Sequence, residues 1–188
     1  MRFTFTPLGL QEVLLVEPDT YPDHRGFFRE TFKSSAFRGG GIGHAFVQAN
    51  VSRSGAGVLR GLHFQRPPAG VAKLVSVVQG RIFDVVADVQ QDSPTLGRWV
   101  GAELSAVDGR SLFVPEGFAH GFAVVSDLAE VEYKCSALYD AADEIAIRFD
   151  DPAIGVAWPV TEPILSRRDA QAMPLADLMD RLPRFDPR

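Results

Sequence analysis

The run Gly57-Val-Leu-Arg-Gly-Leu-His-Phe-Gln65 carries an arginine and a histidine among apolar residues. An imidazole accepts a proton near neutral pH and a phenol can return one, so His63 and Tyr133 are a candidate acid–base pair. Lys73 lies in the otherwise apolar run Val71–Val75, either as a cation facing a developing enolate or as an edge-strand lysine that discourages aggregation. These residue types favour proton-transfer chemistry.

A metal site is the first alternative, because the chain has four histidines, His24, His44, His63 and His120. The position that would share a strand face with His63 holds Gln65, which is not a second strong ligand. The turn Pro115-Glu-Gly-Phe-Ala-His120 resembles one half of the cupin metal pattern, and the other half is missing. Two imidazoles without a third firm ligand make a poor site for zinc or iron, so we expect no metal.

Nucleophilic and phosphate-loop chemistries are disfavoured by the motifs that are missing. Cys135 has no histidine near it in sequence, and Lys134 beside it falls on the opposite strand face, so an inert buried thiol is expected. The chain contains no Gly-x-Ser-x-Gly elbow, no Gly-x-Gly-x-x-Gly and no Walker pattern. Acid–base chemistry therefore remains the leading hypothesis.

Composition indicates an ordinary folded protein, and the 188 residues suit a single domain spanning 1–188. With 19 basic and 24 acidic residues the net charge is −5, which argues against a nucleic-acid surface but allows a small anionic ligand. We find no apolar run of the roughly 20 residues that a membrane helix needs and no secretory signal. The lone Cys135 fits a reducing, cytoplasmic compartment.

Short β-rich runs separated by Gly, Pro, Asp or Ser dominate the chain and predict an all-β sandwich or barrel. Only short helices are expected, around 33–37, after a Ser166 cap at 167–171, and at 175–182. The expected strands are 12–17, 26–32, 44–52, 57–65, 72–79, 81–89, 99–104, 111–114, 121–125, 129–138 and 144–149.

Alternation divides the faces of two of these runs. In 44–52 the apolar residues Ala45, Val47, Ala49 and Val51 share one face, and polar residues share the other. The favoured interpretation places the apolar face on the core and the polar face in water; the alternative is a polar face that lines a pocket. In 129–138 Tyr133 shares a face with Val131 and Cys135, so we expect it to point inward.

Taken together, the motifs identify the chain as resembling the dTDP-4-dehydrorhamnose 3,5-epimerase family. The resemblance runs in order along nearly the whole chain. Its motifs are Asp23-His-Arg-Gly-Phe-Phe-Arg-Glu30, Gln48-Ala-Asn50, Gly57–Gln65, Lys73-Leu-Val75, Ser93-Pro-Thr95, Pro115–Phe122, Glu132-Tyr-Lys134, Trp158-Pro159 and Ser166-Arg-Arg-Asp169.

The resemblance implies a cupin-like jelly-roll β-barrel with short peripheral helices that works as a homodimer without metal or organic cofactor. It implies inversion of C3 and C5 of a dTDP-linked 4-keto-6-deoxyhexose. The C4 ketone acidifies the flanking C–H bonds, a base forms an enolate, and an acid protonates the other face.

The resemblance also implies a role for each matching residue. His63 would be the base oriented by Asp169, Lys73 would stabilise the enolate, and Tyr133 would donate the proton. Diphosphate contacts would come from Arg60 and Arg168, and Tyr139 would stack on the thymine, with Tyr21 a weaker candidate. The sugar nucleotide would also be held by Arg25, Glu30, Gln48, Asn50, His120 and Glu144. Whether Arg25 and Glu30 would act within one chain or across the dimer stays open.

The sequence departs from the family pattern at Val71, Ser76, Val89-Gln90 and Arg168, none of which belongs to the acid–base set. The natural sugar and pathway stay open, as does double against single epimerisation, because some relatives epimerise only C3 or only C5. A non-catalytic sugar-nucleotide-binding cupin and a metal-dependent cupin oxygenase are the rival hypotheses.

Strict alternation would put Arg60 and His63 on opposite faces of one strand. If both reach one substrate, the strand must be irregular, and Gly61 between them is the natural place for a bulge. We therefore predict an irregularity near Gly61.

Overall fold

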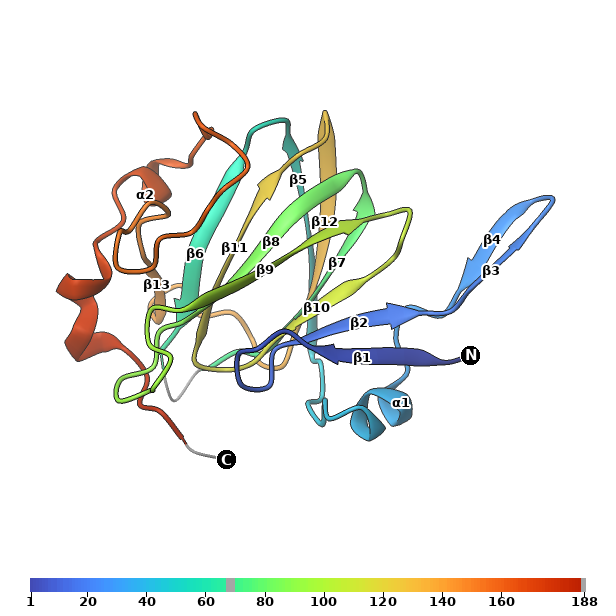
Figure 1. Cartoon of the computed structure of the whole chain (residues 1–188), viewed down its shortest axis with the longest axis horizontal. Coiled ribbons are helices and arrows are strands. Elements are labelled where there is room, and N and C mark those ends of the chain that lie inside the picture. Colours follow the sequence, from blue (N-terminus) through green and yellow to red (C-terminus); the bar gives the residue numbers. More distant parts are fainter. Residues whose placement is uncertain (67–69, 187–188) are drawn as a thin grey trace.

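The computed structural model describes residues 1–66 and 70–186 and consists mainly of antiparallel strands (Figure 1). One sheet has six strands in the order β1 (Phe3–Pro7), β2 (Leu14–Pro18), β10 (Ser111–Val114), β7 (Lys73–Gln79), β12 (Leu128–Cys135) and β5 (Gln48–Gly55). A five-stranded sheet has the order β13 (Glu144–Ala146), β6 (Leu59–Gln65), β11 (Phe118–Val124), β8 (Arg81–Asp88) and β9 (Trp99–Ser105). The predicted all-β class is confirmed.

The two sheets share an apolar core built from inward-facing aliphatic and aromatic residues. The six-stranded sheet contributes Val75, Val77 and Val131, and the five-stranded sheet contributes Ile82, Leu104 and Phe122. Strand β11 is buried along its whole length because it lies between β6 and β8 and both of its faces are covered. Its outer face packs in a second cluster with the C-terminal segment, through residues such as Leu175 and Leu178.

Most expected strands exist with boundaries shifted by a few residues, and two were not predicted. These are β1 and β3 (Thr20–Asp23), which pairs with β4 (Gly26–Arg29) in a separate hairpin. β1 is the first strand of its sheet, and every residue of β3 is exposed. Neither segment shows the buried apolar run from which the other strands were recognised.

Strand β5 shows that the favoured interpretation of its faces is wrong. Val47 and Val51 are 58% and 64% exposed, whereas Asn50 and Ser52 line a cavity. The physical reason is position, because β5 is the edge strand of its sheet and its inner face lies over that cavity rather than over packed core. Alternation identifies which residues share a face but not what covers the face.

The predicted irregularity at Gly61 is confirmed. The register between β6 and β11 shifts between His120 and Phe122, and Gly61 has a φ of 129°. A Cβ atom at Gly61 would lie 2.5 Å from the Cα of Gly121, so glycine is required there by both conformation and space. The shift lets Arg60 and His63 both line the cavity, while Leu62 packs in the cluster on the other face of β6.

The helical segments are short, as expected, and lie outside the two sheets. α1 (Ser34–Gly39) buries Phe37 against Val16, Leu74 and Phe113 on the outer face of the six-stranded sheet. α2 (Arg167–Ala170) begins after Ser166, whose side chain accepts a hydrogen bond from the backbone N–H of Asp169. A 3₁₀ segment, η1 (Leu175–Arg181), follows. In the described ranges, no helix has the length and apolar character needed to cross a membrane.

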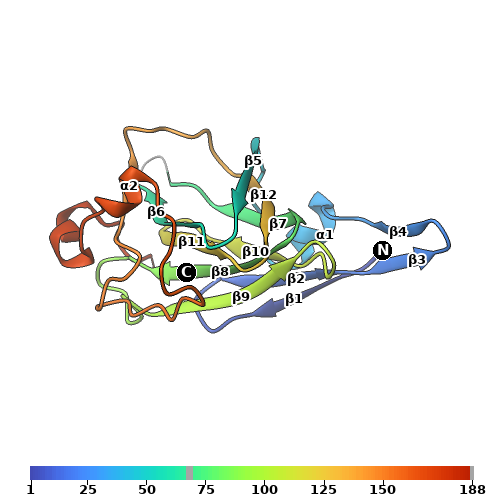
Figure 2. The ribbon, with the colours of Figure 1, turned by 90° about the horizontal axis from the view of Figure 1, so that it is seen from above.

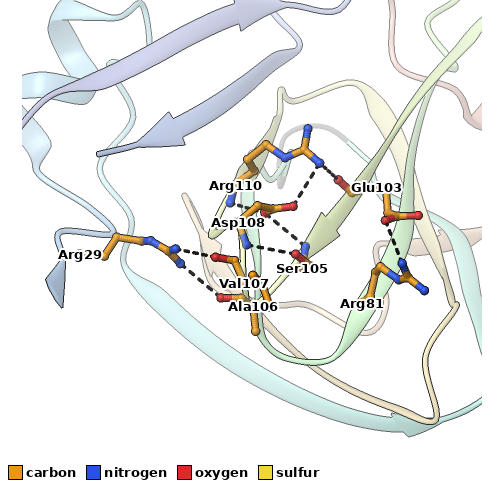
Figure 3. Close-up of polar contacts among 8 residues, drawn as sticks. All are labelled: Arg29, Arg81, Glu103, Ser105, Ala106, Val107, Asp108 and Arg110. Atoms are coloured by element: carbon orange, nitrogen blue, oxygen red, sulfur yellow. Dashed lines mark hydrogen bonds and ion pairs between the residues drawn. The ribbon is translucent and has the colours of Figure 1, made fainter. Parts of the chain in front are cut away.

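The β3–β4 hairpin extends from the body at the end opposite α2, as both views show (Figure 1 and Figure 2). Arg29 fixes its base, donating to the backbone carbonyls of Ala106 at 3.3 Å and Val107 at 2.7 Å (Figure 3). The turn that supplies these carbonyls is held by hydrogen bonds of Asp108 with Ser105 and Arg110. The hairpin is therefore a fixed arm, and it exposes Tyr21, Phe27 and Phe28.

Candidate active site

A cavity of about 360 Å³ gathers side chains from both sheets and from α2. Most of the residues predicted for the site line it: His63, Tyr133, Asp169, Lys73, Asn50, Arg60, His120, Tyr139, Glu144 and Arg168. The predicted residues Arg25, Glu30 and Gln48 do not. The cavity therefore brings together the entire predicted acid–base set.

His63 and Asp169 form a close pair, with 2.5 Å between His63 Nε2 and Asp169 Oδ1. The other carboxylate oxygen accepts from the Ser166 hydroxyl at 2.8 Å, so the N-terminus of α2 holds the carboxylate in place. Burial alone would raise the pKa of Asp169, but the hydrogen bonds from His63 and Ser166 outweigh it and the pKa lies below its usual value. The pair leaves His63 Nδ1 as the nitrogen available to accept a proton.

A second histidine–aspartate pair lies beside the first. His120 stands directly opposite His63 in the β6–β11 ladder, and its Nε2 lies 2.7 Å from Asp84 Oδ1. Both side chains are almost fully buried, and Asp84 Oδ2 has no hydrogen-bond partner among the described residues. Sequence reasoning missed Asp84, although a carboxylate inside the apolar run Ile82–Val86 was a signal, because a buried charge needs a partner.

Tyr133 approaches from the other sheet, on β12. Its ring packs 6.3 Å from the rings of both Phe122 and His120, and its hydroxyl lies 2.7 Å from the Ser52 hydroxyl. Burial raises the pKa of Tyr133 to about 12, against smaller opposing effects of Ser52 and Arg60. The phenol is therefore protonated throughout the neutral range, as a proton donor must be.

Lys73 lies opposite Cys135 in the β7–β12 ladder and lines the same cavity. Burial lowers the pKa of its ammonium group, and its electrostatic interactions with Cys135, Glu144 and Asp84 partly oppose that shift. Among the described residues, none forms a hydrogen bond or ion pair with Lys73. A buried cation of this kind is suited to an anionic oxygen of a ligand.

Two arginines lie in the same cavity as the acid–base residues. Arg60 donates from Nε to Ser54 Oγ at 3.0 Å. Arg168 forms an ion pair with the Glu144 carboxylate, which also accepts from the Tyr139 hydroxyl at 2.8 Å. Arginine side chains suit bidentate recognition of phosphate oxygens, and the Tyr139 ring beside them is half exposed.

The three predicted residues outside the cavity have different environments. Arg25 lies on the hairpin, where its highly exposed guanidinium pairs with Asp23. Glu30 follows the hairpin, and its Oε2 is buried without a partner in the described structure. Gln48 acts indirectly, because it accepts from the backbone N–H of Tyr139 at 3.0 Å and donates to Asn50 at 3.0 Å.

Metal binding finds no support in the side-chain arrangement. Within residues 1–66 and 70–186, no three His, Cys, Asp or Glu side chains gather so that they could hold a metal ion. The chemistry that the cavity offers is proton transfer between a base on one sheet and an acid on the other, next to a buried cation.

Comparison with known proteins gives a consistent result. The family model for dTDP-4-dehydrorhamnose 3,5-epimerase matches residues 7–177. A protein of that name from Methanothermobacter thermautotrophicus is 46% identical over 94% of this chain and 96% of its own length. A dTDP-4-dehydrorhamnose 3-epimerase from Streptomyces niveus is 40% identical over 93% of this chain and 84% of its own.

Solved structures agree with the sequence relatives. The dTDP-6-deoxy-D-glucose-3,5-epimerase of Legionella pneumophila, in complex with dTDP-4-keto-L-rhamnose, superposes with a TM-score of 0.94 at 41% identity. The match covers 98% of this chain and 100% of that one, which confirms the predicted cupin-type fold. With a family model spanning most of the chain and relatives of more than 40% identity, this chain belongs to the dTDP-4-dehydrorhamnose 3,5-epimerase family.

Proposed function

We propose that His63, Lys73 and Tyr133 carry the epimerisation. As a member of its family the chain is an isomerase that converts dTDP-4-dehydro-6-deoxy-D-glucose to dTDP-4-dehydro-L-rhamnose in rhamnose biosynthesis. The observation that carries the residue assignment is that a carboxylate-paired imidazole on β6 and a protonated phenol on β12 line one cavity from opposite sheets. Base and acid on opposite walls suit removal of a proton from one face of a carbon and its return to the other.

The first half of each inversion is loss of a proton next to the C4 ketone. His63 accepts it on Nδ1, and the ionised Asp169 stabilises the imidazolium that forms. The C–H electrons move into the carbon–carbon bond and the ketone oxygen becomes an enolate oxygen. Lys73, which lines the cavity and has no hydrogen-bond or ion-pair partner among the described residues, stabilises that negative charge.

The second half is protonation of the enolate carbon from the opposite face. Tyr133 gives up its phenolic proton, the C–H bond forms and the C4 ketone is restored. Proton transfers of this kind need no organic cofactor and no metal, and we propose that this chain uses neither. The same two residues serve C3 and C5 in turn, because the ketone activates both carbons.

The remaining cavity residues hold the sugar nucleotide. We propose that Arg60 and Arg168 bind the diphosphate and that the half-exposed Tyr139 ring stacks on the thymine. Asn50, His120 and Glu144 contact the nucleotide sugar in the cavity, and Gln48 supports Asn50 and Tyr139 from behind. Arg168 must exchange its present partner Glu144 for phosphate oxygens when the ligand enters.

We propose a homodimer, with residues 1–188 acting as one domain in the cytoplasm. The projecting hairpin exposes two adjacent aromatic rings, Phe27 and Phe28, at 59% and 60%, and exposed apolar surface of this kind marks a site of contact with another chain. Arg25 on this arm and Glu30 directly after it do not line the cavity of their own chain, and we propose that they contribute to the partner's cavity. Sedimentation should give twice the chain mass of 20.5 kDa; a monomer at working concentration would contradict this arrangement.

Solvent isotope exchange tests the reaction. In heavy water the product should carry deuterium at both C3 and C5, and His63→Ala should lose the exchange while still binding dTDP. Deuterium at one carbon alone would indicate a single-carbon epimerase, such as the 3-epimerase of Streptomyces niveus, which is 40% identical to this chain. Binding without any exchange would indicate a non-catalytic sugar-nucleotide-binding protein.

A further inference from the structure

The inner face of β5 carries two serines, and each holds a different cavity residue. Ser52 Oγ lies 2.7 Å from the Tyr133 hydroxyl, and Ser54 Oγ accepts from Arg60 Nε at 3.0 Å. Ser52 lines the cavity and Ser54 is buried. Neither serine belongs to the set inferred from the sequence, and the proton-transfer scheme above uses neither.

We propose that Ser52 is a positioning residue that aims the phenolic proton of Tyr133 at the substrate, an inference that rests on the proposed function. Of two hydroxyls 2.7 Å apart, one donates and the other accepts. If Tyr133 donates to Ser52, its proton points at the strand and away from any substrate. If Ser52 donates, the tyrosine oxygen is satisfied as an acceptor and its own proton is free to point into the cavity.

The surroundings of the pair support this direction. In the described part of the chain, Ser52 and Tyr133 make no other side-chain hydrogen bond, so nothing else orients the phenol. The Tyr133 ring is fixed by Phe122 and His120, so only the direction of its O–H bond can still change. A hydrogen bond donated by Ser52 on β5 determines that direction.

The hydrogen bond between Ser52 and Tyr133 becomes stronger once Tyr133 has given up its proton. When the O–H bond of Tyr133 breaks and the new C–H bond forms, the oxygen becomes a buried phenolate, and Ser52 then donates to a full charge. A hydrogen bond to a charged group is about twice as strong as one between neutral groups, so it favours the transferred state over the starting state. Before the next inversion, water returns a proton to the phenolate of Tyr133 and takes up the proton that His63 removed, so that base and acid are both restored.

Ser54 provides the matched comparison, because it lies two residues along the same face and holds Arg60 instead of Tyr133. Loss of the Ser54 hydroxyl should weaken the positioning of Arg60, which we propose binds phosphate, without affecting the hydrogen bond of Tyr133. The same serine-to-alanine substitution should therefore lower kcat at Ser52 and raise KM at Ser54.

The experiment compares Ser52→Ala, Ser52→Thr and Ser54→Ala in heavy water. Ser52→Ala should lower kcat by about 10- to 100-fold with KM and dTDP affinity kept. Deuterium in recovered substrate should rise relative to product, because His63 still removes protons but the enolate is seldom captured by Tyr133. Ser52→Thr, which keeps the hydroxyl, should restore the parent ratio of deuterium in substrate to deuterium in product. Ser54→Ala should raise KM and leave that ratio at the parent value.

Two results would overturn the inference. One is a Ser52→Ala enzyme with kcat within about twofold of the parent, and the other is a lower kcat with an unchanged ratio of substrate to product exchange, which a purely structural role would give. Failure of the proposed function is distinguishable, since the unmodified enzyme would then show no exchange at either carbon.

Discussion

Two histidine–aspartate pairs stand side by side in this protein and differ in exposure. The His63 side chain is 21% exposed, whereas that of His120 is 4% exposed. Their histidines face one another across the β6–β11 ladder, so distance to the cavity does not separate them. Besides exposure, the pairs differ in how the carboxylate of each is held.

Asp169 is held by a local helix start and accepts from two side chains, one on each oxygen. Asp84 comes from the neighbouring strand β8, is fully buried, and has one oxygen without a partner in the described structure. A satisfied carboxylate beside a partly open imidazole can serve a base that must gain and lose a proton in every turnover. A buried carboxylate beside a buried imidazole is better suited to fixing a hydrogen-bonding group and to setting the local field.

The largest effect should follow from removing the charge at the first pair. Asp169→Asn keeps the side-chain shape but removes the negative charge that, in the proposed mechanism, stabilises the imidazolium of His63. The Ser166 hydroxyl that now donates to Asp169 would meet an amide donor if the amide oxygen stays on His63. Steady-state kinetics should show kcat lower by about 10²- to 10⁴-fold with dTDP affinity retained.

Asp84→Asn is the control for that measurement, because it makes the same change at the other pair. Its kcat at neutral pH should stay within about tenfold of the parent. Equal losses in the two variants would break the comparison and would make both pairs part of the acid–base machinery.

The contrast between the pairs also shows what sequence reasoning could reach. Asp169 was predictable because Ser166-Arg-Arg-Asp169 is both a helix-capping pattern and part of a family motif, and the cap exists. The irregularity at Gly61 followed from a conflict between strand alternation and the need for Arg60 and His63 to share a cavity. In both cases the residues that allow the prediction lie within a few positions of one another in the sequence.

Features that depend on what lies opposite in space could not be predicted in this way. The polar face of β5 was assigned to solvent because alternation does not say which face of a strand is covered. Asp84 looked like one polar residue in an apolar strand, and its partner His120 is 36 residues away. Ser52 gained significance only once Tyr133 was placed 2.7 Å from it.

The smallest and most specific effect should be a change in pH dependence. In the proposed mechanism Lys73 stabilises the enolate only when charged, so kcat/KM should fall as the pH rises through its pKa, which burial has lowered. Tyr133, with a pKa raised to about 12, remains protonated over that range, so the alkaline decline reports Lys73. Asp84 is one of the charges that raise the pKa of Lys73, and Asp169 is not among them.

Asp84→Asn should therefore shift the alkaline decline of kcat/KM to lower pH, whereas Asp169→Asn should lower the whole profile and leave the position of the decline unchanged. The assignment to Lys73 is checked with Lys73→Arg, whose guanidinium stays charged, so that adding Asp84→Asn to it should no longer move the decline. If Asp169→Asn moved the decline as far as Asp84→Asn did, the two carboxylates would act on Lys73 alike. The buried pair would then have no separate electrostatic role.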